Sequence, residues 1–564
     1  MKKLLFGLIF GVMLVSCARV GSPIGGKKDT IAPKFVSANI DSSRVNVPTN
    51  IGELKIYFDE YVNLKDIQKN LIISPPINLT KILPTSLANK YILLQWKEPL
   101  KDSTTYSFNF GNSIVDLNEG NPLPYYNFAF STGDKIDDLF ISGDVFNGME
   151  KRPTDNTTTT NTNDKKNYVV GLYQEKDSID YRKKPNYITK ADADGYFELN
   201  YLSPGKYRIL AFDDENQNSV FDEGKENVAF LKEPIDLQKS ISGKEMKIFP
   251  TKKTLKYKEM KSQVGGAMMI FEGNPMTVNV ESLSEKLQDY KVTHKPKSDT
   301  VNIWFDAAKQ NIGLANSENL KFAYEADDKK GEASLFYREP AQNEMTISNA
   351  RGNLVPPKKP FEITANLPIE KIQPEKWTLN IDSLTTQHFS AKISEDNPYK
   401  ILVSSEFEPG KKYSLTVPKE TVSSYYKSIE KSYQFNFEID KEENYGSFSL
   451  EILNAPDVPF WVQFLDEKGE VQFSKKTTES KLYFTELKPA KYNLRILVDN
   501  NNNGFWDEAD FQTLTFAEDV YFFPKTIEIR PLWENKETWD LKTDSTETPI
   551  LEMNENLTEK EETK

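Results

Sequence analysis

Apolar and polar residues alternate strictly in two neighbouring segments of the N-terminal quarter of the chain. The apolar residues occupy every second position of each segment: Tyr106, Phe108, Phe110, Tyr126, Phe128 and Phe130. A period of two residues is the pattern of a β-strand with one buried face. The two segments therefore predict a hairpin of two strands joined by a long connection.

The same alternation returns 307 residues later without a gap. Its apolar positions are Tyr413, Leu415, Val417, Tyr433, Phe435 and Phe437. A pattern that repeats in register predicts a duplicated module. The connection differs between the copies, since GNSIVDLNEGN in the first becomes PKETVSSYYKS in the second.

A second repeat lies downstream of each predicted hairpin, at a constant spacing of 285 residues. Residues 201–226, YLSPGKYRILAFDDENQNSVFDEGKE, align without a gap with residues 486–511, ELKPAKYNLRILVDNNNNGFWDEADF. Most of the difference between the two spacings is explained by a polar tract at 153–166 of the first copy, PTDNTTTTNTNDKK. Such a Thr/Asn tract has nothing to bury and predicts a mobile loop. The chain thus repeats a unit of two domains.

Length and composition agree with a chain of several β domains. A chain of 564 residues is too long for one hydrophobic core, so domains of about 100 residues each are expected. Aromatic residues reach 12% and are spaced among polar ones, which is typical of half-buried strands. The net charge of −13 repels nucleic acid, so a nucleic-acid partner is not expected.

The N-terminus has the pattern of a signal peptide over residues 1–16. Lys2 and Lys3 precede a short apolar stretch that is too short to cross a bilayer as a permanent helix. LVSC, which ends at Cys17, resembles the lipobox of bacterial lipoproteins. The resemblance implies that Cys17 becomes the N-terminal residue and carries fatty acyl chains such as palmitate. A plain secretory signal with an incidental cysteine is the alternative, and residues 17–29 would then be a tether in either case.

The residues after Cys17 bear on the location. Ala18 stands where an Asp often retains lipoproteins in the inner membrane, so the resemblance implies attachment to the lipid of the outer membrane. Surface export in Bacteroidetes-type bacteria often uses an acidic cluster just past the cysteine, and this chain has Arg19 there. The face of the outer membrane therefore stays open between the cell surface and the periplasm.

Two segments resemble Ig-like domains. Residues 30–135, with TIAP, IYFDEYV, SPP and FAFSTG, resemble the Ig-like β-sandwich of bacterial S-layer proteins and of many Bacteroidetes lipoproteins. Residues 351–441 are the second copy, although they lack the Asp, Glu and Gly of the first copy's connection.

Two other segments, 138–250 and 445–532, resemble the transthyretin-like, or carboxypeptidase-regulatory-like, β-sandwich through motifs such as DGYFELNYLSPGKYRILAFDDENQN. Residues 251–350 match no family, but TVNIWFDA and LKFAYEA alternate and predict another β domain. The charged residues 541–564 predict a disordered tail. The expected fold class is all-β, a tandem series of Ig-like and transthyretin-like sandwiches behind a lipoprotein signal peptide.

The second transthyretin-like copy carries a polar loop with the oxygen spacing of an EF-hand calcium loop. Its candidate ligands are Asp499, Asn501, Asn503, the Phe505 carbonyl, Asp507 and Asp510, with Gly504 at the sharp turn. The first copy keeps fewer candidates: Asp214, Asn216, Asn218 and Asp222. Strand-like rather than helical sequence precedes both loops, and Asn-rich turns also form by bonding their own amides. A calcium site and a purely structural turn both remain open.

Catalytic motifs do not accompany these modules. The two histidines, His294 and His388, have no acidic or cysteine neighbours in a recognisable motif, and zinc-protease, nucleophile-elbow and P-loop motifs are absent from the sequence. We therefore expect a protein that is not an enzyme and that requires no cofactor, with calcium as an optional ligand.

Two functions from different classes follow. The first is a lipid-anchored outer-membrane scaffold, an accessory subunit of an assembly, secretion or uptake complex, whose partner is an outer-membrane barrel protein or another envelope lipoprotein. The second is a calcium-dependent adhesin that binds glycan or another surface through Tyr125, Tyr126 and Trp506. Adhesins usually contain longer tandem arrays than the two repeat units of this chain, so the scaffold is favoured.

Overall fold

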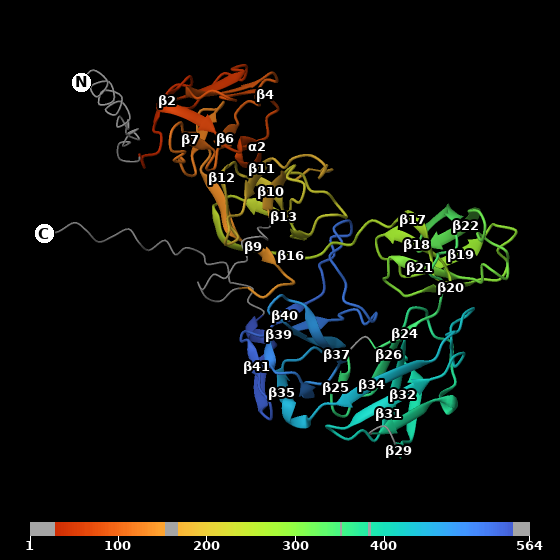
Figure 1. Ribbon diagram of the computed structural model, residues 1–564. Helices are drawn as coiled ribbons and strands as arrows, with labels where there is room; N and C mark the ends of the chain where they lie inside the picture. Colours follow the sequence, from red (N-terminus) through yellow and green to blue (C-terminus); the bar gives the residue numbers. More distant parts are fainter. Residues whose placement is uncertain (1–28, 153–166, 177, 350–351, 382–384, 545–564) are drawn as a thin grey trace, which may run out of the picture.

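The computed structural model describes residues 29–152, 167–176, 178–349, 352–381 and 385–544 (Figure 1). The predicted signal peptide with Cys17, the tether up to residue 28, the loop 153–166 and residues 545–564 of the predicted tail lie outside these ranges. Nearly all regular structure in the described ranges is β, so the predicted all-β fold class is confirmed.

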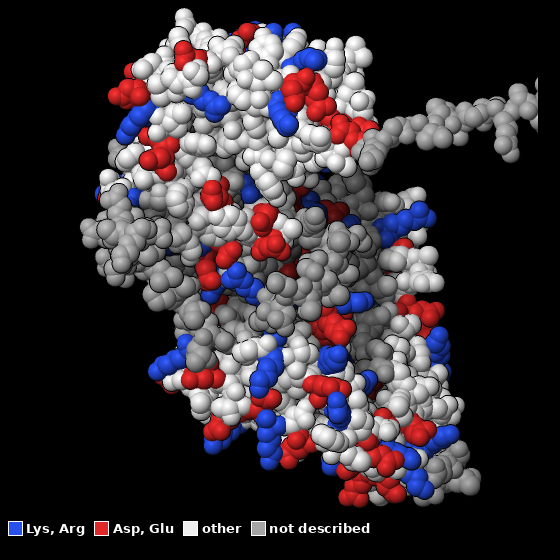
Figure 2. Space-filling model, turned by 90° about the vertical axis from the view of Figure 1, so that its left-hand side faces the viewer, with Lys and Arg blue, Asp and Glu red and all other residues white. Residues whose placement is uncertain are grey.

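The described residues form five β modules, each around its own cluster of buried apolar side chains. We number them 1 to 5 along the chain: residues 35–131, 139–248, 256–337, 345–439 and 446–541. On the face shown in Figure 2, acidic and basic side chains are interspersed.

Module 1 is a sandwich of two sheets. Its elements are β1 (Phe35–Ala38), β2 (Glu53–Leu64), α2 (Ile67–Asn70), β3 (Ile72–Ser74), β4 (Leu79–Leu83), β5 (Asn89–Trp96), β6 (Thr105–Asn109), β7 (Ile114–Asp116) and β8 (Asn127–Ser131). One sheet has the order β1-β2-β5-β4, with β7 paired to β2, and the other has the order β3-β6-β8. The predicted hairpin is β6 with β8, in which Tyr106 lies opposite Phe130. In each of these strands every residue except one terminal residue is buried.

Module 4 repeats this sandwich. Its elements are β24 (Ile347–Ser348), β25 (Leu354–Val355), β26 (Phe361–Ala365), β27 (Lys371–Ile372), η2 (Pro374–Lys376), β28 (Thr378–Ile381), β29 (Thr385–Thr386), β30 (Phe389–Ile393), β31 (Lys400–Ser405), β32 (Lys412–Val417), β33 (Val422–Ser423) and β34 (Tyr433–Ile439). In the hairpin of β32 and β34, Tyr413 lies opposite Phe437. This is the Tyr106–Phe130 pair moved by the predicted spacing, so the duplication of the hairpin is confirmed.

Modules 2 and 5 share one topology. Module 2 contains β9 (Leu139–Asn147), β10 (Tyr168–Gln174), β11 (Tyr187–Lys190), β12 (Tyr196–Leu202), β13 (Gly205–Asp213), β14 (Val228–Phe230), β15 (Ile235–Leu237) and β16 (Ile241–Ile248). Module 5, after the short η3 (Glu442–Asn444), contains β35 (Gly446–Leu453), β36 (Phe460–Leu465), β37 (Val471–Thr477), β38 (Lys481–Leu487), β39 (Ala490–Val498), β40 (Val520–Phe522), β41 (Ile527–Ile529), β42 (Glu534–Asp540) and α3 (Leu541–Asp544). Their sheets correspond strand by strand: β12-β9-β16 to β38-β35-β42, and β11-β10-β13-β14 to β37-β36-β39-β40.

The end of module 5 lies beyond the boundary that the sequence suggests at residue 532. Strand β42 pairs in parallel with β35, and Leu541 is buried in the module's core. The first residues of the predicted disordered tail, 541–544, therefore form the short helix α3 at the end of a folded module.

Module 3 is the β domain predicted from the alternating segments TVNIWFDA and LKFAYEA. Its strands are β17 (Lys256–Gln263), β18 (Gly266–Glu272), β19 (Val278–Ser282), β20 (Lys291–His294), β21 (Thr300–Trp304), β22 (Glu318–Ala326) and β23 (Lys329–Tyr337). They form the sheets β17-β18-β21-β20 and β19-β22-β23. The two alternating segments lie on β21 and β22.

The five modules do not form a straight row. The chain passes from module 1 through modules 2, 3 and 4, and module 5 then comes back beside module 2 (Figure 1). A sixth apolar cluster joins them, because Ala509 and Phe511 of module 5 pack with residues of β10 and β13 of module 2. The sheet of module 2 is thus buried on both faces, one by its own sandwich and one by a loop from the far end of the chain.

Candidate functional site

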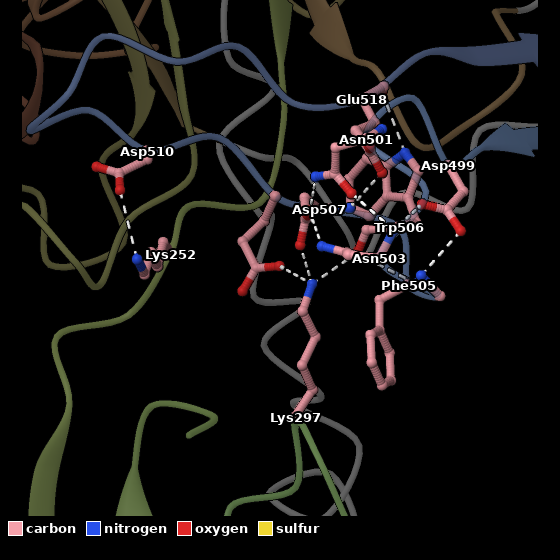
Figure 3. Close-up of polar contacts among 12 residues, drawn as sticks. Lys252, Lys297, Asp499, Asn501, Asn503, Phe505, Trp506, Asp507, Asp510 and Glu518 are labelled. Carbon is pink, nitrogen blue, oxygen red and sulfur yellow. Dashed lines mark hydrogen bonds and ion pairs between the residues drawn. The ribbon is translucent and has the colours of Figure 1, made fainter. Parts of the chain in front are cut away.

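The loop that joins module 5 to module 2 contains the polar segment predicted from the sequence. It follows β39 directly, and we call residues 499–518 the clasp loop. Figure 3 shows its polar side chains converging around Asp499 and Asp507. It thereby combines a polar cluster at its start with a hydrophobic contact surface at its end.

Asp499 organises the start of the clasp loop. Its side chain is completely buried, and its carboxylate accepts backbone hydrogen bonds from Asn503 at 2.9 Å and Gly504 at 2.9 Å. Lys476 of β37 forms an ion pair with the same carboxylate at 3.1 Å. Gly504 has φ +93°, a conformation that glycine adopts without a Cβ penalty, so the turn predicted at this residue is present.

Asp507 closes the turn from the other side. Its carboxylate accepts hydrogen bonds from the side-chain amides of Asn501 at 2.5 Å and Asn503 at 2.6 Å. The oxygens of these two amides accept backbone N–H groups, from Asn503 at 3.0 Å and from Phe505 at 2.9 Å. Four of the predicted ligand side chains, those of Asp499, Asn501, Asn503 and Asp507, are therefore brought together (Figure 3).

Asp510 does not join this cluster. Its carboxylate instead accepts the backbone N–H of Gln512 at 3.1 Å and pairs with Lys252 at 3.5 Å, apart from the other residues (Figure 3). The EF-hand register is thus wrong at its last position, because the chain turns away toward module 2 after Asp507. Glu518 takes that place: it accepts the backbone N–H groups of Asn501 at 3.1 Å and Asp507 at 2.9 Å.

The first copy of the loop, residues 214–226, has the same design, and we call it the first polar loop. Asp214 is buried and accepts the backbone N–H groups of Asn218 and Ser219, both at 3.0 Å. The Asn216 amide donates to Asp222 at 2.5 Å. Glu226 accepts the N–H groups of Glu215 at 3.2 Å and Asp222 at 2.9 Å, as Glu518 does for its own loop.

Burial and charge set the protonation of the acidic groups in both loops. Burial raises the pKa of Glu226 to about 7, against the opposing hydrogen bond from Asp222. It also raises the pKa of Glu518. For Asp507, burial opposes ionisation, but the hydrogen bonds from Lys297 and from the two Asn amides hold its pKa below the usual value.

Lys297, in the turn between β20 and β21 of module 3, binds the clasp loop. Its ammonium forms ion pairs with Asp507 and, at 3.7 Å, with Glu508. It also donates to the Trp506 carbonyl at 3.2 Å and lies 5.3 Å from the centre of the Phe505 ring. Module 3 is thus tied to module 5 by one lysine, which supplies positive charge at the centre of the polar cluster.

The donor set fits a hard cation in its chemistry. Asp499, Asp507 and Glu518 provide carboxylate oxygens, and Asn501 and Asn503 provide amide oxygens, which are the ligand types that calcium prefers. Within the described ranges, however, His, Cys, Asp and Glu side chains alone form no group of three or more that could hold a metal. A cation here would have to use the Asn oxygens and compete with the ammonium groups of Lys297 and Lys476.

The end of the clasp loop packs on module 2 through Phe511. This ring makes edge-to-face contacts with Tyr181 at 4.9 Å, Phe221 at 5.0 Å and Phe230 at 5.5 Å between centroids. Such pairs stabilise by about 0.5–1.5 kcal/mol each beyond the burial of their area. Phe221 itself lies within the first polar loop, directly before the acceptor Asp222, so the two repeated loops meet at this aromatic cluster.

Backbone hydrogen bonds fix the same junction. Ala509 accepts from Lys252 at 2.7 Å and donates to Pro250 at 2.9 Å, which makes a parallel bridge between Thr251 and Ala509. Arg495 of β39 adds a hydrogen bond to the Met149 carbonyl of module 2 at 3.0 Å. The clasp loop is therefore held by ring packing, backbone pairing and ion pairs together.

Of the three aromatic residues proposed to bind a glycan, two are packed against the protein and one is exposed. Trp506 is half-buried and donates its ring N–H to the Glu518 carbonyl at 3.1 Å, and Tyr126 packs against Phe58 and Phe110. Tyr125 is 77% exposed. Cys17, the predicted lipidation site, lies outside the described residues.

Comparisons with known proteins support the Ig-like assignment of module 1. Residues 29–132 match the family model described as a bacterial Ig-like domain, which confirms an Ig-like domain over the segment expected at 30–135. No curated protein matches the chain. Among the described residues, no helix has the length and apolar character needed to span a membrane.

Three solved structures align with the chain at low similarity. The S-layer protein rSbsC is 13% identical, with a TM-score of 0.14, over 88% of this chain and 67% of that one. The glucan-utilisation protein SGBP-B of Bacteroides ovatus is 8% identical, with a TM-score of 0.18, over 65% and 89%. The BSP domain of a biofilm-associated protein is 10% identical, with a TM-score of 0.15, over 92% and 99%. Similarity this low carries no argument about function.

Proposed function

We propose that this protein is a non-enzymatic scaffold, anchored by acyl chains on Cys17 to the outer membrane, that serves as an accessory subunit of an outer-membrane protein complex. The observation that carries the proposal is the clasp loop. It ties modules 2, 3 and 5 together, although its contacts are far apart in the sequence: 258 residues separate the bonded partners Thr251 and Ala509. A flexible string of domains can extend to variable distances. A closed arrangement of domains instead holds its surfaces at fixed distances, which suits a subunit that positions other proteins.

The adhesin is less well supported by the arrangement of its aromatic residues. An aromatic platform for a glycan needs exposed ring faces, but Trp506 and Tyr126 are engaged inside the protein. Tyr125 alone of the three presents its ring to solvent. We therefore retain the scaffold as the single proposed function.

Membrane extraction tests this function. We expect the chain purified from membranes in mild detergent to carry acyl chains on its N-terminal cysteine, read by intact mass, and to bring a stoichiometric barrel protein or envelope lipoprotein with it. Cys17→Ser is the control and should release the chain from the membrane fraction. A chain that comes alone and binds immobilised glycan would overturn the scaffold in favour of the adhesin.

Calcium is the second part of the proposal. Asp499, Asn501, Asn503, Asp507 and Glu518 would hold the ion, with an affinity in the weak extracellular range of roughly 10⁻⁴ to 10⁻³ M. The ion supplies positive charge to a cluster where Lys297 and Lys476 now provide it. Binding would therefore strengthen the polar turn while weakening the ion pair to module 3.

The calcium proposal predicts a change in thermal stability. We expect calcium at about 5 mM to raise the melting temperature of the full chain, and Lys297→Gln to enlarge this rise because a competing cation is removed. The double variant Asp499→Ala, Asp507→Ala should show no rise. Magnesium at the same concentration is the control, since it demands a tighter octahedral shell. Equal melting curves with and without calcium in all variants would mean that the loop is a purely structural turn that binds no calcium.

A further inference from the structure

A groove lined by both apolar and polar residues lies between module 1 and module 2, where Lys184, Ile188 and Ser219 of module 2 also line it. It has a volume of about 700 Å³, within the range of about 300–1,000 Å³ of typical ligand sites. The half-buried side chains of Ile73, Ile77, Leu79 and Ile82 line it. Two of these residues, Leu79 and Ile82, lie on strand β4.

Strand β4 has a free edge. It pairs with β5 and with no other strand among those the structure describes, so one row of its backbone N–H and C=O groups faces outward. Unpaired edges are templates for strand addition, and natural proteins usually shield them with charge, proline or a covering segment. Proteins that recognise extended peptides use such an edge together with pockets for alternate side chains.

Module 4 shows that an edge of this kind of sandwich accommodates an added strand, although there the strand joins the other sheet. Its strand β28 corresponds to β3, since Leu379 lies opposite Leu415 as Ile73 lies opposite Phe108. In module 4 a short segment of the same chain, β29, pairs with β28 on the way to β30. Between β3 and β4 of module 1 no strand of this chain intervenes, and the groove lies there instead.

The charges on the groove favour an acidic occupant. Lys81 and Lys184 line it, and none of its lining residues is Asp or Glu. Both lysines are exposed, and neither takes part in an ion pair within the described residues. This is a local excess of positive charge on a chain whose net charge is −13, so it attracts carboxylates that most of the surface repels.

We propose that this groove binds an extended segment of a partner protein that alternates apolar and acidic residues. The segment adds as a strand to the free edge of β4. Its apolar side chains enter between Ile73, Ile77, Leu79 and Ile82, and its carboxylates face Lys81 and Lys184. The proposal rests on the proposed function only in that the partner is a protein, and it does not require an acylated Cys17.

Fluorescence anisotropy of a labelled peptide of about six alternating valine and glutamate residues, the usual length of a strand, tests the proposal. We expect saturable binding to the full chain below about 1 mM, and hydrogen-exchange protection confined to β4 and its neighbours. The same peptide with alternate backbone amides methylated should not bind, because it keeps the side chains and loses the strand donors. A valine–lysine peptide should not bind either.

Charge reversal in the protein completes the test. The double variant Lys81→Glu, Lys184→Glu should bind the acidic peptide at least about tenfold more weakly, whereas Lys97→Glu, an exposed lysine of module 1 outside the groove, should bind it unchanged. No saturable binding by the intact chain would overturn the proposal. So would binding that survives both backbone methylation and charge reversal, since the groove would then be a general apolar site. Using Cys17→Ser protein throughout keeps this result separate from the membrane-anchoring test.

Discussion

Phe511→Ala is expected to open the clasp. The ring is 7% exposed and contacts three aromatic rings of module 2, so its removal leaves a cavity between two modules. Loss of a buried Phe typically costs about 3–5 kcal/mol, and each 1.4 kcal/mol changes an equilibrium about tenfold. The closed arrangement should therefore lose at least about a hundredfold in population, while each module keeps its own core.

Two measurements on the full chain check this result. Hydrogen exchange should accelerate in β10 and β13, whose outer face the clasp loop covers, and small-angle scattering should show a larger radius of gyration. Phe336→Ala is the matched control, because Phe336 of module 3 is 73% exposed and its loss should change neither quantity. Unchanged exchange and scattering in Phe511→Ala would mean that the other contacts suffice to hold module 5 against module 2.

The sequence predicts the strands and the duplication well because both depend on local patterns. The period of two survives as alternate burial in the hairpin of module 4, whereas nearly all residues of the module 1 hairpin are buried. The register is kept in both copies, since Tyr413 and Phe437 repeat Tyr106 and Phe130. When two copies of a segment align without gaps and their strands pair in the same register, each residue of one copy lies at the same position of the sheet as its counterpart in the other. The topology of modules 2 and 5 follows the same logic.

The clasp could not be predicted in the same way, because its partners are far apart in the sequence. One signal was available: Val169–Leu172 and Ile209–Phe212 are continuous apolar runs rather than alternating ones. A strand without polar alternation is usually buried on both faces, so β10 and β13 required a cover beyond their own sandwich. The sequence does not say that residues 509–517 supply it.

The polar cluster was predicted in part. Four residues of the cluster were identified from their spacing, because they lie close together in one short loop: Asp499, Asn501, Asn503 and Asp507. Asp510 was misplaced and Glu518 was missed, since an EF-hand spacing assumes a helix after the loop and this loop continues into an extended segment. In the first polar loop, Glu226 comes four residues after Asp222, whereas Glu518 comes eleven after Asp507, so no fixed spacing finds both.

The two loops also change how the duplication is understood. Phe221 and Phe511 come from the two repeated loops, and their ring centroids lie 5.0 Å apart, so modules 2 and 5 are joined through the loops that they share. The polar turns set the direction in which each loop leaves its sandwich, and an aromatic residue within or just after each turn makes the contact. Damage to either polar turn should then be felt at the aromatic junction.

Asp499→Ala tests this coupling. The carboxylate is fully buried and accepts two backbone N–H groups, which lose their partner in the variant. Each buried donor left unsatisfied costs about 1–3 kcal/mol, and the ion pair with the partly exposed Lys476 adds about 1 kcal/mol at most. We expect module 5 to be destabilised by about 2 kcal/mol or more and the exchange of β10 and β13 in module 2 to accelerate as well.

Asp116 in module 1 provides a matched control for that coupling. It is also buried, and its carboxylate accepts the N–H groups of Glu119, Gly120 and Asn121 at 2.8, 2.9 and 3.1 Å. Asp116→Ala therefore removes the same chemistry from a turn that lies far from the clasp in the sequence, and it should destabilise module 1 without changing exchange in β10 and β13. If Asp499→Ala likewise leaves those strands protected, the polar turn and the aromatic junction act independently, and the clasp depends on Phe511 and the Ala509 backbone alone.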